Sequence, residues 1–198
     1  MIGLVDYGVG NTGSLGNALH HLELRFLLSA DSEVLDSCER LILPGVGAFG
    51  PAMERLHDLQ LDSYLREWAV SGRPLLGICL GMQLLLSKSY EHGHHSGLNL
   101  IPGEVKKIQD APREVHMGWN EVVPCQEDQL LPEPGYGYFV HSYYCAPDDP
   151  NVILAHTDYG GSLAAVIRSD NLVGIQFHPE KSQAFGLDIL RRFGNGSF

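Results

Sequence analysis

The sequence lacks several features that would assign the chain to a broad class of protein. Only 13 of its 198 residues are Lys or Arg, against 24 Asp or Glu, and this acidic balance argues against a nucleic-acid-binding protein. Its four cysteines include no Cys-x-x-Cys pair, which favours a reduced compartment. No apolar run approaches the length that spans a bilayer, and Met1 to Asp6 lacks the basic residues of an export signal. We therefore expect a cytoplasmic protein that contacts neither nucleic acid nor membrane.

What the sequence does contain is an alternation of short apolar runs, glycine-rich turns and amphipathic stretches. The chain is long enough for one globular domain with a substantial core, residues 1–198. The apolar runs of its first half predict strands at 2–5, 24–28, 40–43 and 75–78. The amphipathic stretches predict helices at 14–22, 49–56, 61–70, 82–86 and, at the end of the chain, 182–193.

The second half of the chain is rich in strands. Its predicted strands are 104–108, 121–123, 138–144, 152–155, 163–167 and 172–177. The alternating first half predicts an α/β fold with a mostly parallel central sheet and helices on both faces. The later strands predict an antiparallel extension of that sheet or a flanking sheet.

The segment Gly77-Ile-Cys79-Leu-Gly81 is the most informative in the chain. It has the spacing of a G-x-S-x-G nucleophile elbow with cysteine in place of serine, between a predicted strand and a predicted helix. The N-terminus of such a helix directs N–H groups at the sulfur, which lowers the pKa of a thiol and stabilises an oxyanion. The alternative is a small buried cysteine at the end of a strand.

A cysteine nucleophile needs a base, and His178 is the best placed of the 10 histidines. It follows the predicted strand 172–177, and Pro179 restricts the backbone so that Glu180 can lie beside the imidazole. A carboxylate on one ring nitrogen leaves the other facing the thiol, as in the catalytic triads. His141 is the main competitor, although its place within an apolar strand favours a core histidine.

Other patterns support weaker alternatives. Gly8, Gly10 and Gly13 match G-x-G-x-x-G, with Asp31 or Glu33 near the distance of a ribose-binding acid, so a dinucleotide site is possible on pattern alone. The loop 44–47 is either an anion-binding nest or a plain turn. The histidines at 92, 94 and 95 lack a regular ligand spacing, and we expect a solvated loop there and no metal.

Three motifs together resemble the class I (triad) glutamine amidotransferases: Pro44-Gly-Val-Gly47, Gly77-Ile-Cys-Leu-Gly-Met-Gln83 and His178-Pro-Glu-Lys-Ser182. Four further features resemble the glutaminase subunits of imidazole glycerol phosphate synthases, in histidine biosynthesis. They are residues 6–11, 116–120 and 138–143 and the lysine at 181. The resemblance extends from the first predicted strand to the last helix.

The resemblance implies a triad of Cys79, His178 and Glu180, in which Cys79 attacks the side-chain amide of L-glutamine and forms a γ-glutamyl thioester. It implies an oxyanion hole at Val46, Gly47 and Leu80. It also implies glutamine-binding residues at Gln83, Glu91, Ser142 and Tyr143. Ser142 stands where the family often has threonine, and it retains the hydroxyl group.

The resemblance further implies a heterodimer with a cyclase subunit of (β/α)8 barrel fold. Ammonia would pass to that partner, which makes imidazole glycerol phosphate and AICAR without a cofactor in this chain. Family positions near the contact are Met117, Trp119, Tyr138 and Lys181, for which packing or a surface charge is the alternative role. Two other functions remain open: a glutaminase of another class I pathway, such as one making a pyridoxal cofactor or anthranilate, and a non-catalytic nucleotide-binding or regulatory module.

Overall fold

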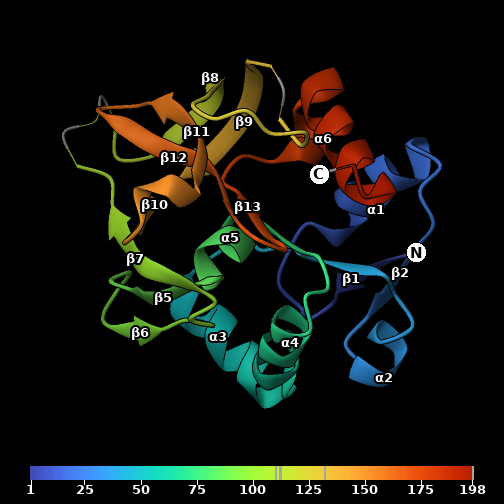
Figure 1. Cartoon of the computed structure of the whole chain (residues 1–198). Helices are drawn as coiled ribbons and strands as arrows, with labels where there is room; N and C mark the ends of the chain where they lie inside the picture. Colours follow the sequence, from blue (N-terminus) through green and yellow to red (C-terminus); the bar gives the residue numbers. More distant parts are fainter. Residues whose placement is uncertain (110, 112, 132, 198) are drawn as a thin grey trace.

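A computed structural model describes residues 1–109, 111, 113–131 and 133–197, which fold around two β-sheets (Figure 1). The larger sheet has nine strands in the order β2-β1-β3-β4-β13-β12-β11-β8-β9. Its strands are β1 (Ile2–Val5), β2 (Phe26–Ser29), β3 (Arg40–Leu43), β4 (Leu75–Ile78), β8 (His116–Pro124), β9 (Gly135–His141), β11 (Ile153–Asp158), β12 (Ser162–Ser169) and β13 (Leu172–Ile175). Pairs from β2 to β13 are parallel and pairs from β13 to β9 are antiparallel. The predicted α/β fold, with antiparallel strands from the second half of the chain, is confirmed.

Helices cover both faces of the large sheet because alternate strand residues enter two different cores. In β3, Leu41 and Leu43 join one core and Ile42 joins the other. The first core is covered by α3 (Phe49–Asp58) and α4 (Leu61–Val70), the second by α1 (Thr12–His21) and α6 (Gln183–Asn195). Two shorter helices are α2 (Ser32–Leu35) and α5 (Leu80–Leu84). No helix in the described ranges is long and apolar enough to cross a membrane.

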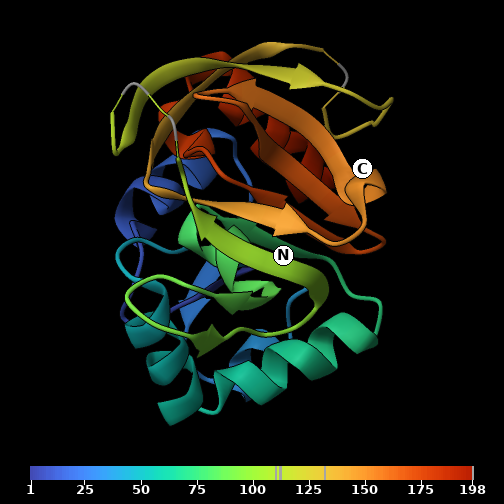
Figure 2. The same cartoon turned by 90° about the vertical axis from the view of Figure 1, so that its left-hand side faces the viewer.

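The smaller sheet has the order β10-β7-β5-β6 and packs beside α3 and α5. Its strands are β5 (Leu86–Ser89), β6 (His95–Ser96), β7 (Ile101–Lys107) and β10 (Tyr143–Pro147). Leu86, Val105 and Cys145 bury their side chains in the core shared with α3 and α4. Figure 2 shows this sheet between those helices and the antiparallel strands of the large sheet.

The structure corrects three predicted elements. The predicted strand 172–177 ends at Ile175, so Gln176 and Phe177 lie beyond β13. The helix after Cys79 ends at Leu84, because Leu86 begins β5. The predicted strand 138–144 is two strands, β9 and β10, which belong to different sheets and separate at Ser142. The apolar pattern of this segment is continuous, so its partners β8 and β7 decide where one strand ends and the next begins.

Candidate active site

The pairing of β4 with β13 brings two distant segments to one edge of the large sheet. The strands are parallel neighbours with Ile78 opposite Ile175, so the residues that follow them emerge side by side. Cys79 directly follows β4, and its backbone N–H donates to the carbonyl oxygen of Ile175 at 2.7 Å. His178 follows β13. The sheet order therefore brings Cys79 and His178 to the same edge.

Cys79 lies in a sharp turn between β4 and α5. Its φ of 55° and ψ of −110° are rarely adopted by residues with a side chain. The two neighbouring glycines are sterically required, because a Cβ at Gly77 would lie 2.5 Å from the oxygen of Gly81. A Cβ at Gly81 would lie 1.9 Å from the oxygen of Leu43. The abrupt strand-turn-helix expected from the spacing of Gly77, Cys79 and Gly81 is present.

His178 and Glu180 form a buried pair. Nδ1 of His178 lies 2.9 Å from Oε1 of Glu180, and the two side chains are 3% and 2% exposed. Burial disfavours the charged imidazole, but the neighbouring Cys79 and the hydrogen-bonded carboxylate of Glu180 outweigh it and raise the pKa of His178 to about 9. The predicted neighbourhood of the two side chains is confirmed. The backbone differs from the expected extended path, because Pro179–Lys181 form a short 3-10 helix.

The backbone of His178 is tied to β9 by Ser182. The Ser182 hydroxyl donates to the carbonyl oxygen of His178 at 2.6 Å and accepts from the N–H of Tyr138 at 2.9 Å. The N–H of His178 donates to the carbonyl oxygen of Tyr138 at 2.9 Å. Ser182 belongs to the quoted motif at 178–182, but this anchoring role was not predicted from the sequence.

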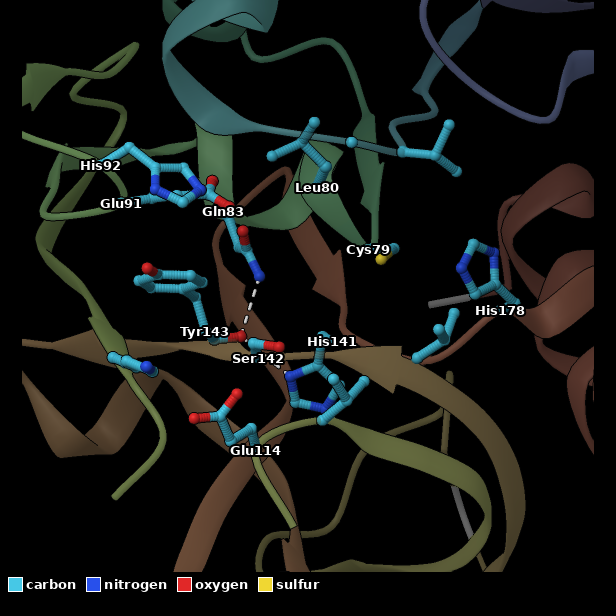
Figure 3. Close-up of a pocket in the computed structure, with 15 residues that line it drawn as sticks. Cys79, Leu80, Gln83, Glu91, His92, Glu114, His141, Ser142, Tyr143 and His178 are labelled. Carbon is cyan, nitrogen blue, oxygen red and sulfur yellow. Dashed lines mark hydrogen bonds between the residues drawn. The ribbon is translucent and has the colours of Figure 1, made fainter. Parts of the chain in front are cut away.

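Cys79 and His178 line one pocket of about 440 Å³ (Figure 3). The figure shows the His178 ring directed toward Cys79. Glu180, which lies at Nδ1 of that ring, is not among the residues that line the pocket. The predicted oxyanion and glutamine-binding residues also line this pocket: Val46, Gly47, Leu80, Gln83, Glu91, Ser142 and Tyr143. Sequence reasoning did not assign six further lining residues to the site: His92, Lys107, Glu114, Val115, Val140 and His141.

The glycine loop 44–47 forms one wall of the pocket and packs closely against the elbow. A Cβ at Gly45 would lie 2.7 Å from the N of Gly81, and Gly47 has a φ of 92°. The buried hydroxyl of Tyr7 donates to the carbonyl oxygen of Pro44 at 2.7 Å. The close approach at Gly45 and the hydrogen bond from Tyr7 hold the loop against Leu80 and Gly81.

Two polar residues of the pocket are fixed by contacts within the protein. The Oε2 atom of Glu91 accepts from the N–H of Phe49 at 2.7 Å, at the start of α3. The Nε2 atom of Gln83 donates to the carbonyl oxygen of Tyr143 at 3.0 Å and to Oε1 of Gln176 at 3.2 Å. Gln176 was not singled out from the sequence, although a lone amide near the end of the predicted apolar strand 172–177, two residues before His178, is a detectable signal.

The four residues predicted at a partner contact lie outside the pocket and share one surface. Met117 and Trp119, on β8, are 66% and 48% exposed. The rings of Trp119 and Tyr138 meet edge to face at 6.0 Å, and Nζ of Lys181 lies 5.9 Å from the centre of the Tyr138 ring. Tyr138 is half-buried and Lys181 is exposed. Packing in the core is therefore wrong for Met117, Trp119 and Lys181, while a surface charge stays the alternative role of Lys181.

The weaker alternatives receive no support from the described residues. Asp31 caps α2, since its side chain accepts from the N–H of Glu33. Gly13 lies inside α1. Within the described ranges, no three His, Cys, Asp or Glu side chains are grouped as metal ligands; His92 lines the pocket, and the His95 ring packs on Gly50.

Comparison with known proteins agrees with this geometry. The family model described as glutamine amidotransferase class-I matches residues 4–195. Imidazole glycerol phosphate synthase subunit HisH of Methanothermobacter thermautotrophicus is 47% identical over 98% of this chain and 97% of its own length. The protein of the same name from Aquifex aeolicus is 45% identical over 96% and 94%.

Solved structures show the same fold at low sequence identity. A structure described as a glutamine amidotransferase superposes with a TM-score of 0.79 at 20% identity and covers 98% of both chains. The structure of PurLQS from Thermotoga maritima gives a TM-score of 0.75 at 18% identity over 98% of this chain and 97% of that one. With the family match and the HisH relatives, the conclusion is that this chain belongs to the class I glutamine amidotransferase family, among the HisH glutaminase subunits.

Proposed function

We propose that the chain hydrolyses L-glutamine to glutamate and ammonia through a γ-glutamyl thioester on Cys79. The observation that carries this proposal is the position of Cys79, held at a strained turn in a pocket beside the buried His178–Glu180 pair. The pKa of His178, raised to about 9, leaves its imidazole protonated at neutral pH. A neighbouring imidazolium stabilises a thiolate and is ready to protonate a leaving amine.

In the first half-reaction, Sγ of Cys79 attacks the side-chain amide carbon of glutamine, and the carbonyl electron pair moves to the oxygen. The N–H of Leu80, with an N–H from Val46 or Gly47, donates to that oxyanion. The intermediate then collapses, the C–N bond breaks, and His178 gives its proton to the departing nitrogen. Ammonia leaves and the thioester remains on Cys79.

In the second half-reaction, neutral His178 takes a proton from water, and the hydroxide oxygen attacks the thioester carbon. The C–S bond breaks, the thiolate of Cys79 is regenerated beside the protonated imidazole, and glutamate is released. Glu180 keeps Nδ1 of His178 as the donor, so that Nε2 faces the reaction. Gln83, Glu91, Ser142 and Tyr143 hold the glutamine, as the family resemblance implies.

We further propose that ammonia passes, unprotonated, to a cyclase subunit of (β/α)8 barrel fold in a heterodimer. That partner would form imidazole glycerol phosphate and AICAR in histidine biosynthesis. The name of the HisH relatives, subunits of imidazole glycerol phosphate synthase, supports this assignment. The exposed surface of Met117, Trp119, Tyr138 and Lys181 is the proposed contact. We propose that the chain works in the cytoplasm, a location supported by its four free cysteines.

The test is the variant Cys79→Ala in the complex with the cyclase subunit. Synthesis driven by glutamine should be lost, because no thioester can form, while synthesis driven by added ammonium should continue. Cys125→Ala is the matched control, since Cys125 is exposed and does not line the pocket. Full glutamine-driven synthesis by Cys79→Ala would refute the proposal. Co-purification with a different synthase would instead move the chain to another class I pathway.

A further inference from the structure

Gln176 is buried next to the nucleophile but has no role in the mechanism above. It is 0% exposed, and it is not among the residues that line the pocket. Its Nε2 lies 3.9 Å from Sγ of Cys79, and its backbone N–H donates to Ala165 of β12 at 2.9 Å. Gln176 therefore approaches the sulfur from the protein side, where it cannot contact a substrate in the pocket.

The orientation of the Gln176 amide is determined by the carbonyl oxygen of Tyr143. That oxygen can only accept, so the atom of Gln83 at 3.0 Å from it must be the amide nitrogen. The same nitrogen then donates to the oxygen of Gln176 at 3.2 Å. With its oxygen directed at Gln83, Gln176 necessarily presents its NH₂ group to Cys79.

The same carbonyl oxygen also fixes a buried pair of histidines. It accepts from Nδ1 of His141 at 2.8 Å, so the proton of that ring is on Nδ1. Nε2 of His141 is then an acceptor, and Nδ1 of His116, at 3.0 Å from it, must donate. Nε2 of His116 in turn accepts from the amide of Asn120 at 3.1 Å. Each ring nitrogen of the two histidines therefore has a hydrogen-bond partner when both rings are neutral. Burial favours this neutral state, because it lowers the pKa of His116 to about 4 and that of His141 to about 3.

We propose that Gln176 is a positioning residue for Cys79, and that the His116–His141 pair supports it by holding the Tyr143 carbonyl oxygen and thereby the Gln83 amide. The proposal rests on the proposed role of Cys79 as nucleophile. The N–H of Gln176 holds the sulfur in one orientation and stabilises its thiolate, because hydrogen bonds to charged groups are stronger than those to neutral ones. The hydrogen bonds continue from His116 to Asn120 of β8, the strand that carries Trp119, and from Asn120 to the carbonyl oxygen of Asp158 on β11.

The test measures the alkylation rate of Cys79 by iodoacetamide as a function of pH, by mass spectrometry of its peptide. In Gln176→Met, which loses the N–H donor, the pH of half-maximal rate should rise by about one unit. Gln176→Glu keeps the oxygen for Gln83 but places a carboxylate near the sulfur, so the rise should be larger. The exposed Cys125 in the same molecule is the internal control and should be unchanged. His178 is retained in every variant.

The supporting pair is tested by His116→Phe, which keeps a ring between Phe139 and Tyr159 but loses the donor to His141. A smaller shift in the same direction is expected. Combining His116→Phe with Gln176→Met should raise the pH of half-maximal alkylation little beyond the value for Gln176→Met alone, because both substitutions act through the same contacts. Tyr159→Phe is the matched control, since it keeps the stacked ring and should leave the profile unchanged.

Three results would overturn the proposal. An unchanged profile in both Gln176 variants contradicts positioning of the sulfur. An unchanged profile in His116→Phe, or fully additive shifts in the double variant, contradicts support by the histidine pair. Gln176→Glu preserves the side-chain volume and carries the test if Gln176→Met does not fold. Failure of a glutamine-like electrophile to label Cys79 in the unmodified chain would instead contradict the proposed function, because iodoacetamide reactivity does not depend on glutamine.

Discussion

Two buried histidine sites flank the pocket and behave in opposite ways. His178 pairs with the carboxylate of Glu180, and its pKa is raised to about 9. His116 and His141 pair with each other, and burial lowers their pKa values to about 4 and 3. Each of the three residues is no more than 7% exposed. Burial alone therefore does not decide the charge of a histidine here; the partner at hydrogen-bonding distance does.

This difference separates two tasks. A base that exchanges protons with a substrate needs a carboxylate to hold its tautomer and to stabilise the imidazolium. A pair that only holds a carbonyl oxygen works best when it stays neutral, because each ring then has one donor and one acceptor. The chain places the charged site beside Cys79, the proposed nucleophile, and the neutral site at another part of the lining, where His141 adjoins Ser142 and Tyr143.

The largest expected effect comes from removing the carboxylate that distinguishes the two sites. In Glu180→Gln, His178 should lose its fixed tautomer and its raised pKa, and the kcat for glutamine hydrolysis should fall by about 10²- to 10⁴-fold. Steady-state kinetics and an NMR titration of the His178 ring measure the two changes. Glu54→Gln, an exposed carboxylate on α3, is the control. Native activity with His178 still titrating near its native pKa would contradict the role of Glu180.

An intermediate effect on stability is expected at the neutral pair. His141→Phe leaves Nδ1–H of His116 without its acceptor and removes a donor from the Tyr143 carbonyl oxygen. The free energy of unfolding should fall by about 1–3 kcal/mol, measured by urea denaturation. His20→Gln, on the exposed face of α1, should change it little. A variant as stable as the native chain would show that the pair contributes nothing to the fold.

The smallest change, taken over one pH unit, is the pH dependence of the free energy of unfolding, for which the two sites predict opposite slopes. The pKa of His178 is raised in the folded state. Its contribution to the free energy of unfolding is therefore full below about pH 6.5 and is lost as the pH rises through about 9. The pKa values of His116 and His141 are lowered, so their contribution is present above about 6.5 and is lost as pH falls toward 4. Each group changes the unfolding free energy by at most about 1.4 kcal/mol per pH unit.

Urea denaturation from pH 4 to 9 measures both slopes. His116→Phe should make the free energy of unfolding depend less on pH in the acidic range. Glu180→Gln should make it depend less on pH in the alkaline range. If His116→Phe changed the alkaline slope instead, or Glu180→Gln the acidic slope, the assignment of charged and neutral sites would be contradicted.

Sequence reasoning succeeded where the structure is local. The bounds of β1, β3, β4 and α4 match their predicted strands and helix. Each has a clear apolar pattern, and those of β1, β3 and α4 stop at Asp6, Pro44 and Ser71. The pairing of His178 with Glu180 was predictable since the two residues are close in sequence. The break at Ser142 was not predictable, because the strands on either side have similar patterns and different partners.

The sequence by itself determined the elbow at Cys79, the His178–Glu180 pair, the α/β class and the family. The first three depend on steric limits and periodicities that act within a few residues, and the family on the resemblance of the motifs. Only the tertiary structure decided that β13 is the neighbour of β4, that Gln176 reaches the Cys79 sulfur, and that His116 lies opposite His141 across β8 and β9. The physical reason is that a residue's partner across a sheet is set by strand order and register, which depend on how the whole core packs.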